Sequence, residues 1–178
     1  INWMLRFCRL LLRNRRDIDS LTNRYDELLL DSHKDPLTGL ANRKALEEFI
    51  ARQSKLPANA TLLMIDLDFF KKVNDVNGHL VGDELLRRIG AHIAALMRDG
   101  DVCARVGGDQ FAVLLNGVES SIDALRICEQ LVALPAFAPN GNGQQLHPRC
   151  RVGVAISDNE REDAESLLRD ADNALHKA

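Results

Sequence analysis

Two acidic residues stand beside apolar runs, where a buried strand would hold a carboxylate at the edge of a sheet. Asp66 closes a nearly continuous apolar segment, and Asp109 follows Gly107 and Gly108 just before another apolar segment. If the two strands are neighbours, their carboxylates converge, and carboxylates with phosphate oxygens form the hard oxygen site that Mg²⁺ prefers. The pattern predicts metal-assisted chemistry on a phosphate compound, although an isolated Asp in such a place is as often a helix cap or a turn residue.

The segment 105–111 predicts a β-hairpin, because β-branched and aromatic residues flank the glycine pair. We expect Gly107 and Gly108 to supply the positive φ angles of a tight turn. Since they carry no side chains, they would also let a bulky anionic ligand approach the backbone. For the three residues Gly-Gly-Asp alone, an ordinary hairpin with a polar tip is the alternative interpretation.

The remaining apolar patterns predict helices and strands in a mixed order. The segment 60–67 is almost entirely apolar, as expected for a strand that is buried on both faces at the centre of a sheet. Asn42 is placed to cap the first helix of the domain. This order of elements predicts an α+β domain, a central sheet with helices packed on it. Helices are expected at 43–53, 68–75, 82–97, 122–134 and 164–177, and a further strand at 150–157.

Four ordered segments of the chain resemble the GGDEF family, the diguanylate cyclases. The resemblance covers 35–178 and implies a palm-like, nucleotidyl-cyclase-like fold, with a largely antiparallel central sheet flanked by helices. Gln110 occupies the position where the family usually has a second acid. The four segments are 35–43 (DPLTGLANR), 65–71 (IDLDFFK), 74–83 (NDVNGHLVGD) and 105–111 (RVGGDQF).

The resemblance implies that the domain condenses two GTP molecules into cyclic di-GMP and releases two pyrophosphates, with Mg²⁺ as cofactor and Mn²⁺ as an alternative. Asp109 would hold metal and help deprotonate or orient the attacking 3′-hydroxyl, and Lys71 would neutralise charge on the phosphates. Asp66 and the main-chain carbonyl of Leu67 would complete the metal site. The residues implied to bind substrate are Asn74, His79, Asp83, Phe70, Gly107 and Gly108.

Asn74 and Asp83 carry the chemistry that recognises guanine. Aspartate accepts from the ring N–H and the exocyclic amine, which adenine does not present in that pattern, and asparagine both donates and accepts at the purine edge. Buried polar groups left unpaired by the wrong base give strong discrimination. Each residue taken separately is more often a helix cap. In the same way, Lys71 alone would be a solvated lysine, Phe70 a core residue and His79 a turn residue.

Gln110 is the departure from the family pattern that bears on activity. An amide keeps the size and hydrogen bonding of a carboxylate but lacks its charge, so it is a poorer ligand for Mg²⁺. Because Asp109 keeps its acid, we expect a working but slower enzyme. The alternative is a catalytically inactive GGDEF-like module that binds GTP or cyclic di-GMP as a sensor. A cyclase of another base specificity is a third interpretation, against which Asn74 and Asp83 argue.

Arg98 and Asp101 form an RxxD segment that the five residues 102–106 separate from the signature glycines. This spacing resembles the inhibitory product site of the family, at which Arg98 would pair with phosphate or guanine and Asp101 with a guanine edge. RxxD by itself is usually a surface ion pair. Some members supply a second arginine from the next helix. That position is taken here by Gln130, near Arg126, so we expect weak inhibition.

The segment 4–28 places apolar residues at alternating steps of three and four, with Asn14 as the polar exception. This is the heptad pattern of a coiled coil. We expect 1–34 to form a parallel dimeric stalk ahead of the GGDEF domain at 35–178, so that two domains, each holding one GTP, act as a homodimer. An amphipathic helix packed on its own domain is the alternative. The Asp-Pro pair that opens the domain ends the stalk.

Composition sets limits on the class of protein. A chain of 178 residues with 46% hydrophobic content suits one globular domain with a helical appendage. The net charge of −3 gives no general attraction to nucleic acid. The four cysteines lack CxxC spacing, which favours reduced thiols in the cytoplasm over disulfides or zinc.

The N-terminal segment is too short and too rich in arginine to span a bilayer. Its arginines from Arg6 to Arg16 fit either the inner-face charge bias beside a membrane helix or a solvated helix face. Because the chain opens with Ile1, we expect a cytoplasmic excerpt of a longer protein, without its upstream sensor or membrane region. Anchoring of that protein in the inner membrane follows only from the first interpretation of the arginines. We also expect the family's basic phosphate-contacting residues to lie beyond Ala178, together with any phosphodiesterase motif of the EAL type.

Overall fold

The computed structural model describes residues 32–52, 60–118, 121–138, 145–157 and 164–178. The chain divides into two units, Ile1–Lys34 and Asp35–Ala178. Nearly all of the predicted stalk lies outside the described residues, so the structure below is that of the second unit. Among the described residues, no helix is both long and apolar enough to cross a lipid bilayer.

Strands and helices alternate irregularly along the domain. The strands are β1 (Ala41–Asn42), β2 (Thr61–Leu67), β3 (Val102–Arg105), β4 (Gln110–Leu115) and β5 (Cys150–Ile156). The helices are α2 (Arg43–Arg52), α3 (Phe70–Asn77), α4 (His79–Leu96), α5 (Ser121–Val132) and α6 (Ala164–Leu175).

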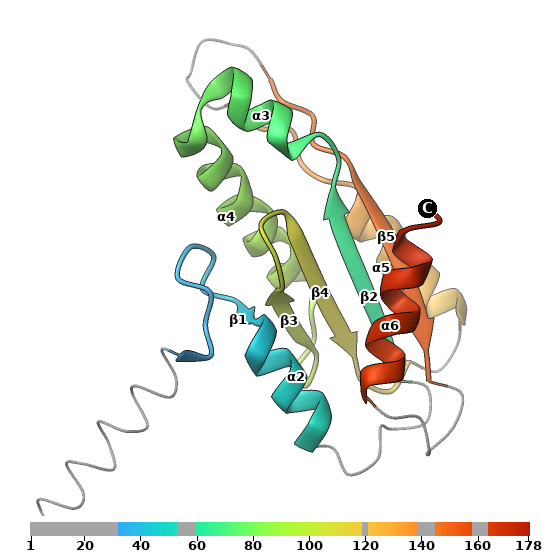
Figure 1. Cartoon of the computed structure of the whole chain (residues 1–178). Helices are drawn as coiled ribbons and strands as arrows, with labels where there is room; N and C mark the ends of the chain where they lie inside the picture. The colour runs from blue at the N-terminus through green and yellow to red at the C-terminus, as the bar shows by residue number, and fades with distance from the viewer. Residues whose placement is uncertain (1–31, 53–59, 119–120, 139–144, 158–163) are drawn as a thin grey trace, which may run out of the picture. The chain divides into compact units, whose positions relative to one another are not determined.

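The strands form one five-stranded sheet in the order β1-β3-β4-β2-β5 (Figure 1). β1 runs parallel to β3, and the other three neighbouring pairs are antiparallel. The predicted α+β fold with a largely antiparallel sheet is therefore confirmed. β2 is an interior strand, as predicted, because β4 and β5 flank it, although β4 holds the middle place. All residues of β2 except Asp66 are buried.

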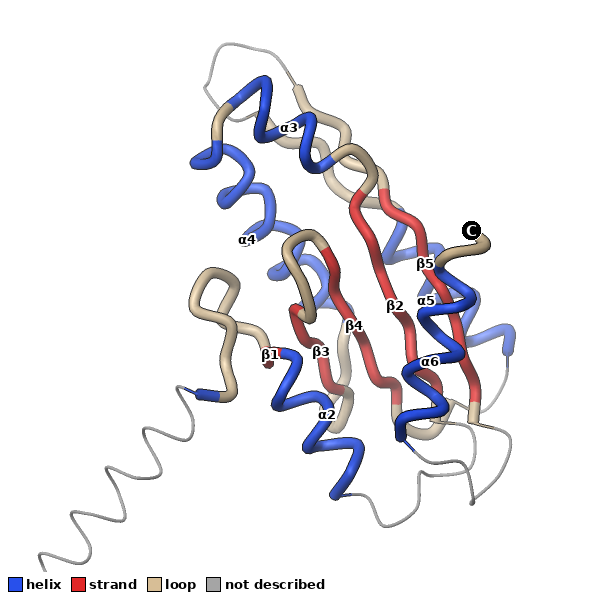
Figure 2. The backbone as a smooth tube through the Cα atoms, in the orientation of Figure 1, coloured by secondary structure: helices blue, strands red, loops and turns tan. Residues whose placement is uncertain are grey.

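Helices cover both faces of the sheet (Figure 2). α2 and α6 pack on the face that carries Leu62 and Met64 of β2. α4 and α5 pack on the opposite face, which carries Leu63 and Ile65. Since side chains alternate between the two faces of a strand, Asp66 emerges on the same face as Leu62 and Met64.

Three residues set where the helices begin. Asn42 caps α2 as predicted, because its Oδ1 accepts a hydrogen bond of 2.9 Å from a backbone N–H in the first turn. α3 begins at Phe70, two residues later than predicted, because Phe69 takes the left-handed conformation with φ of 57°. α4 begins at His79, three residues earlier than predicted, since Gly78 with φ of 86° ends α3 and opens α4 within one residue.

The close approach of α6 to β5 depends on a glycine. A Cβ atom on Gly153 of β5 would overlap the backbone N of Leu175 and the carbonyl oxygen of Ala171. A residue without a side chain is therefore required there, and it lets the backbone of α6 lie directly on the sheet.

The three cysteines among the described residues, Cys103, Cys128 and Cys150, are free thiols of intermediate exposure. Burial raises the pKa of each thiol, and it raises the pKa of Cys150 to about 11. At neutral pH they stay protonated, and a protonated thiol is a poor nucleophile and a poor metal ligand.

Candidate functional site

Three side chains form a row across one end of the sheet, on the face covered by α2 and α6. Asp66 of β2 is paired in register with Gln110 of β4 on one side and with Arg151 of β5 on the other. Directly opposed residues of antiparallel strands point to the same face, with Cβ atoms about 4.5–5.5 Å apart. We call Gln110, Asp66 and Arg151 the transverse row.

Arg151 bridges two carboxylates at the end of β2. Its Nη2 donates to Oδ2 of Asp66 at 2.6 Å, and its Nε donates to Oδ1 of Asp68 at 3.0 Å. The side chains of Asp66 and Asp68 are 17% and 25% exposed, against 43% for Arg151. The two ion pairs are therefore partly shielded from water. Arg151 could not be found from the sequence, because only the register of β5 against β2 places it opposite Asp66.

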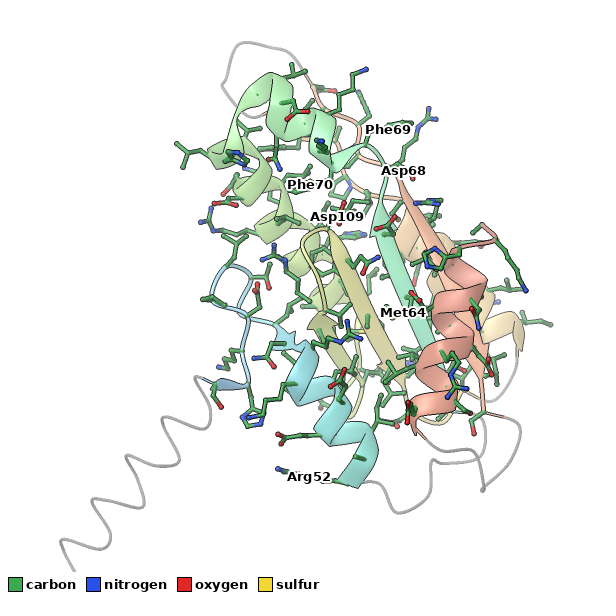
Figure 3. All side chains as sticks on the ribbon, in the orientation of Figure 1. Arg52, Met64, Asp68, Phe69, Phe70 and Asp109 are labelled. Atoms are coloured by element: carbon green, nitrogen blue, oxygen red, sulfur yellow. The ribbon has the colours of Figure 1, made fainter. Side chains whose placement is uncertain are left out.

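The signature loop, residues 106–109 between β3 and β4, lies beside the end of β2. The main-chain oxygen of Asp109 accepts a hydrogen bond of 3.3 Å from the backbone N–H of Leu67. Figure 3 shows Asp109 at the tip of this loop and Asp68 at the end of β2. The condition for convergence is met, since β2 is the neighbour of β4, the strand that follows Asp109. The residue directly opposite Asp66, however, is Gln110.

The prediction that the signature glycines supply positive φ angles is wrong. Neither Gly107 nor Gly108 is among the glycines of positive φ. Four residues separate the two strands, so the two-residue turn that demands such angles does not form. The Nη2 and Nε of Arg105 instead hold the loop by donating to the carbonyl oxygen of Gly108 at 2.7 and 3.2 Å. A Cβ on Gly107 would lie 3.2 Å from Oε1 of Gln110, whereas nothing lies within 4 Å of one on Gly108.

Arg105 also joins the signature loop to the start of the domain. Its Nη1 lies 3.2 Å from each carboxylate oxygen of Asp35. Asp35 Oδ1 further accepts hydrogen bonds from the amide and hydroxyl of Thr38 at 2.9 and 2.6 Å. Partial burial by itself raises the pKa of Asp35, but the Thr38 hydrogen bonds and Arg105 outweigh it and lower the pKa below its usual value. Asp35 therefore acts as an anion that anchors Arg105.

The N-terminus of α3 has no side-chain cap. Phe69, the residue before it, is 76% exposed and holds a left-handed backbone conformation. Such a conformation is strained for an aromatic residue, and this kind of strain concentrates at functional sites. The N–H groups at the start of a helix have no partner within the helix and attract anions. Lys71 lies exposed in the same turn, so two sources of positive potential coincide there.

Asn74 of α3 carries a buried acceptor without a partner, its Oδ1. An unpaired buried acceptor costs free energy, which a ligand with a donor would recover. Gly82 of α4 makes room for this side chain, since a Cβ there would overlap Asn74 Oδ1 and lie 3.2 Å from Cζ of Phe70. Asp83 follows on α4 with intermediate exposure, and His79 is exposed at the start of that helix. The structure thus brings Asn74, Phe70 and Gly82 together.

The RxxD segment lies in a turn next to α5. Asp101 Oδ2 accepts a hydrogen bond of 3.0 Å from the backbone N–H of Arg98, and Asp101 Oδ1 accepts one of 3.1 Å from that of Asn116. Both carboxylate oxygens therefore hold backbone N–H groups, and Arg98 is an exposed residue. Arg98 and Asp101 line one polar cavity of about 290 Å³. Arg126 and Gln130 are both exposed on α5.

The oxygen atoms that could hold a metal come from the end of β2 and the signature loop. They are the carboxylates of Asp66 and Asp109 and the main-chain carbonyl of Leu67. In the part of the chain that the structure describes, no group of three or more His, Cys, Asp or Glu side chains is arranged for a metal. An ion at this edge would need further oxygens from water or a ligand, which is how Mg²⁺ is commonly bound beside phosphates.

Comparison with known proteins gives one family. The family model described as the GGDEF domain of diguanylate cyclases matches residues 32–178. Diguanylate cyclase TpbB of Pseudomonas aeruginosa is 36% identical over 152 residues, which are 83% of this chain and 35% of that protein. Response regulator PleD of Caulobacter vibrioides is 33% identical over 174 residues, which are 94% of this chain and 38% of that protein. The chain thus spans little more than a third of the length of these curated relatives.

A solved structure agrees in fold. The coiled coil and GGDEF domain of DgcB from Caulobacter crescentus, crystallised in complex with c-di-GMP, matches with a TM-score of 0.81 at 25% sequence identity. The match covers 93% of this chain and 90% of that one.

Replacing Asp35 with Asn should lower the free energy of unfolding by about 1–3 kcal/mol at neutral pH, because Arg105 loses its partly buried partner. Since the folded state lowers the pKa of Asp35, the stabilisation is complete above the usual value of about 3.9 and is lost as the pH falls through the lowered value. In urea unfolding, the difference between the parent and Asp35→Asn should shrink as the pH falls from about 5 to about 2.

Asp99, which is exposed, provides the control, and Asp99→Asn should match the parent across the same pH series. A difference between parent and Asp35→Asn that stayed constant with pH would contradict the role given to the Asp35 charge.

Proposed function

The chain belongs to the GGDEF domain family of diguanylate cyclases, and we propose that it condenses two GTP molecules into cyclic di-GMP with the help of Mg²⁺. The observation that carries this proposal is the convergence of Asp66, the signature loop with Asp109 and the uncapped start of α3 at one end of the sheet. In each step a ribose 3′-hydroxyl gives up its proton with the help of Asp109, and its oxygen attacks an α-phosphorus. The bond from that phosphorus to the oxygen it shares with the β-phosphate breaks, and pyrophosphate leaves.

Asp66, Asp109 and the carbonyl of Leu67 would hold the metal ion. They fit Mg²⁺ because all their donors are hard oxygens, and Mn²⁺ accepts the same donors. The bound ion supplies positive charge at the phosphate oxygens. The contribution of the chain itself is position, and Asp109 additionally orients the attacking 3′-hydroxyl toward the phosphorus of the second GTP.

The start of α3 would bind the triphosphate. Its first N–H groups lack a side-chain cap, so phosphate oxygens can accept from them directly, and the helix dipole favours negative charge at this end. Lys71 adds a mobile positive charge in the same turn. The open space at Gly108 leaves the signature loop accessible to the same anion.

The guanine base would lie at Asn74 and Asp83. The unpaired Oδ1 of Asn74 needs a donor, and guanine offers its ring N–H and exocyclic amine, the same groups that the carboxylate of Asp83 accepts from. Phe70 packs beside Asn74 and shapes the pocket, and His79 lies exposed at its rim. Adenine would leave these acceptors unsatisfied, which is the physical basis of selectivity for GTP.

Two such domains are needed for one product, because each holds a single GTP. We assign the contact between them to the predicted stalk of 1–34, which would make the chain a homodimer. Its substrate, GTP, places the domain in the cytoplasm. Light scattering that found only monomers at the concentrations that support catalysis would contradict this assembly.

Product inhibition through Arg98 and Asp101 completes the proposal. The guanidinium of Arg98 is exposed and available for a phosphate or a guanine of cyclic di-GMP. Because both oxygens of Asp101 already accept backbone N–H groups, its contact with a guanine edge would use remaining lone pairs. We therefore expect inhibition to be weak and to depend mainly on Arg98.

Gln110 favours one competing function, a catalytically inactive module that binds GTP or cyclic di-GMP as a sensor. Gln110 lies directly opposite Asp66, so the site lacks, at its centre, the negative charge that a second acid would carry. We favour the cyclase because Asp66, Asp109 and the carbonyl of Leu67 remain.

Incubation of the parent chain with GTP and Mg²⁺ should yield cyclic di-GMP on chromatography. Asp109→Ala should lower the rate by about a hundredfold or more. Gln110→Glu should raise it by about twofold to tenfold, because a second carboxylate beside Asp66 strengthens metal binding. If the parent makes no product while calorimetry still detects GTP, the inactive sensor is correct. Turnover of ATP in preference to GTP would instead reject the guanine pocket.

Gly82→Ala should weaken binding of a non-hydrolysable GTP analogue by about tenfold to a hundredfold, because the new methyl group displaces Asn74 from its pocket. Calorimetry measures the affinity, and circular dichroism checks folding. Ala91→Ser, at an exposed position of the same helix, is the control and should bind like the parent. Unaltered affinity in folded Gly82→Ala would show that Asn74 does not contact the base.

Arg98→Ala should raise the concentration of added cyclic di-GMP that halves the initial rate by about fivefold or more, since a charge-assisted contact is lost. The rate without added product should stay the same, because Arg98 is not one of the residues proposed to bind metal or GTP. An unchanged inhibition curve would show that Arg98 does not bind the product and that the RxxD segment only forms a turn.

A further inference from the structure

The transverse row contains a cation, Arg151, that the proposed chemistry does not use. We propose that Arg151 is a resident counter-ion of the metal site, paired with Asp66 and Asp68 until a metal-bound nucleotide displaces it. This inference rests on the proposed function, because that function assigns Asp66 to the metal. It states the condition under which the site accepts the metal more readily, namely the presence of nucleotide.

The ion pairs of Arg151 are built into the sheet. Arg151 and Asp66 occupy paired positions of β5 and β2, and the backbone N–H of Asp68 donates to the carbonyl of Arg149 at 2.8 Å, which extends the contact beyond the last strand pair. Two different nitrogens of one guanidinium meet two carboxylates, at 2.6 and 3.0 Å. A planar guanidinium is well suited to this fixed geometry.

The guanidinium and a divalent cation compete for one carboxylate, that of Asp66. Mg²⁺ binds carboxylate oxygens at about 2.0–2.1 Å, and Oδ2 of Asp66 already accepts from Arg151 at 2.6 Å. The other neighbour of Asp66 in the row, Gln110, is neutral and cannot offset the charge of the arginine. Without nucleotide, Arg151 therefore neutralises one of the two negative charges of Asp66 and Asp68, and a metal ion alone must compete with it.

A metal-bound triphosphate changes this balance. It brings negative phosphate oxygens to the end of β2. Arg151, which is 43% exposed, can then exchange its carboxylate partners for phosphate without being left unpaired. Displacement of Arg151 is thus more favourable when metal and nucleotide arrive together than when the metal arrives alone. The consequence is a site that binds the free metal more weakly than a site without Arg151 would, but binds the metal-bound nucleotide with the same affinity as such a site.

Arg149 provides a matched control. It lies two residues before Arg151, carries the same charge and is exposed. Its backbone carbonyl contacts Asp68, whereas neither of the ion pairs at Asp66 and Asp68 involves its side chain. Removing its charge tests for a general electrostatic effect without touching the proposed pairs.

The test is titration of nucleotide-free protein with Mn²⁺, followed by the paramagnetic resonance signal of the free ion. Arg151→Gln should bind Mn²⁺ about fivefold to tenfold more tightly than the parent, because the competing cation is gone. Arg151→Lys should tighten binding by a smaller factor, since an ammonium pairs as a point charge and loses the two-carboxylate fork. Arg149→Gln should change the affinity by less than about twofold.

Adding a non-hydrolysable GTP analogue should bring the Mn²⁺ affinities of the parent and Arg151→Gln to within about twofold of each other. Unchanged or weaker Mn²⁺ binding by both Arg151 variants, without nucleotide, would overturn the proposal. So would a gap that the analogue leaves intact, because Arg151 would then not be displaced. Circular dichroism checks each variant, and Arg151→Lys alone suffices if Arg151→Gln does not fold.

Asp66→Asn separates this proposal from the proposed function. If it abolishes Mn²⁺ binding while the Arg151 variants bind like the parent, the metal site stands and the counter-ion role is wrong. If the parent and every variant fail to bind Mn²⁺ both with and without the analogue, the metal site at Asp66 is wrong, and the counter-ion role is rejected with it.

Discussion

The register of β2 between β4 and β5 is the constraint on which the site depends. Because β2 is hydrogen-bonded on both sides, Asp66 has fixed neighbours, Gln110 and Arg151, on the same face of the sheet. A shift of β2 by one residue would turn the side chain of Asp66 to the opposite face of the sheet, away from Gln110 and Arg151. That face is apolar, and an unpaired carboxylate there would cost free energy. The strand register therefore decides which side chains meet at the site, and the charge of the site is that of the three side chains that the register aligns.

The signature loop takes its position from outside its own sequence. Arg105 holds the carbonyl of Gly108 and is itself held by Asp35. The first turn of the domain and the loop that carries Asp109 thus share one side chain. A shift of that turn would move Arg105 and with it the carbonyl of Gly108, because breaking the partly buried ion pair would leave an unpaired charge.

Sequence reasoning succeeded where the controlling interactions are local. The apolar run of β2 and the Asn42 cap were predictable because burial and capping leave patterns within a few residues. The positive φ expected at Gly107 and Gly108 was wrong because Arg105, pairing with a residue far away in the chain, permits a longer loop. Arg151 was invisible for the same reason, since strand register is a long-range property.

The family membership and the converging groups support one account, in which the end of β2 holds metal, the start of α3 holds phosphate and the helix pair α3 and α4 holds guanine. The most direct test is a crystal structure of this chain with Mg²⁺ and a non-hydrolysable GTP analogue. The account predicts the ion on Asp66 and the Leu67 carbonyl, the phosphates at α3 and the base against Asn74. A nucleotide bound instead in the cavity of about 800 Å³ that Arg43, Met64 and His176 line between α2 and α6, away from Asn74, would contradict it.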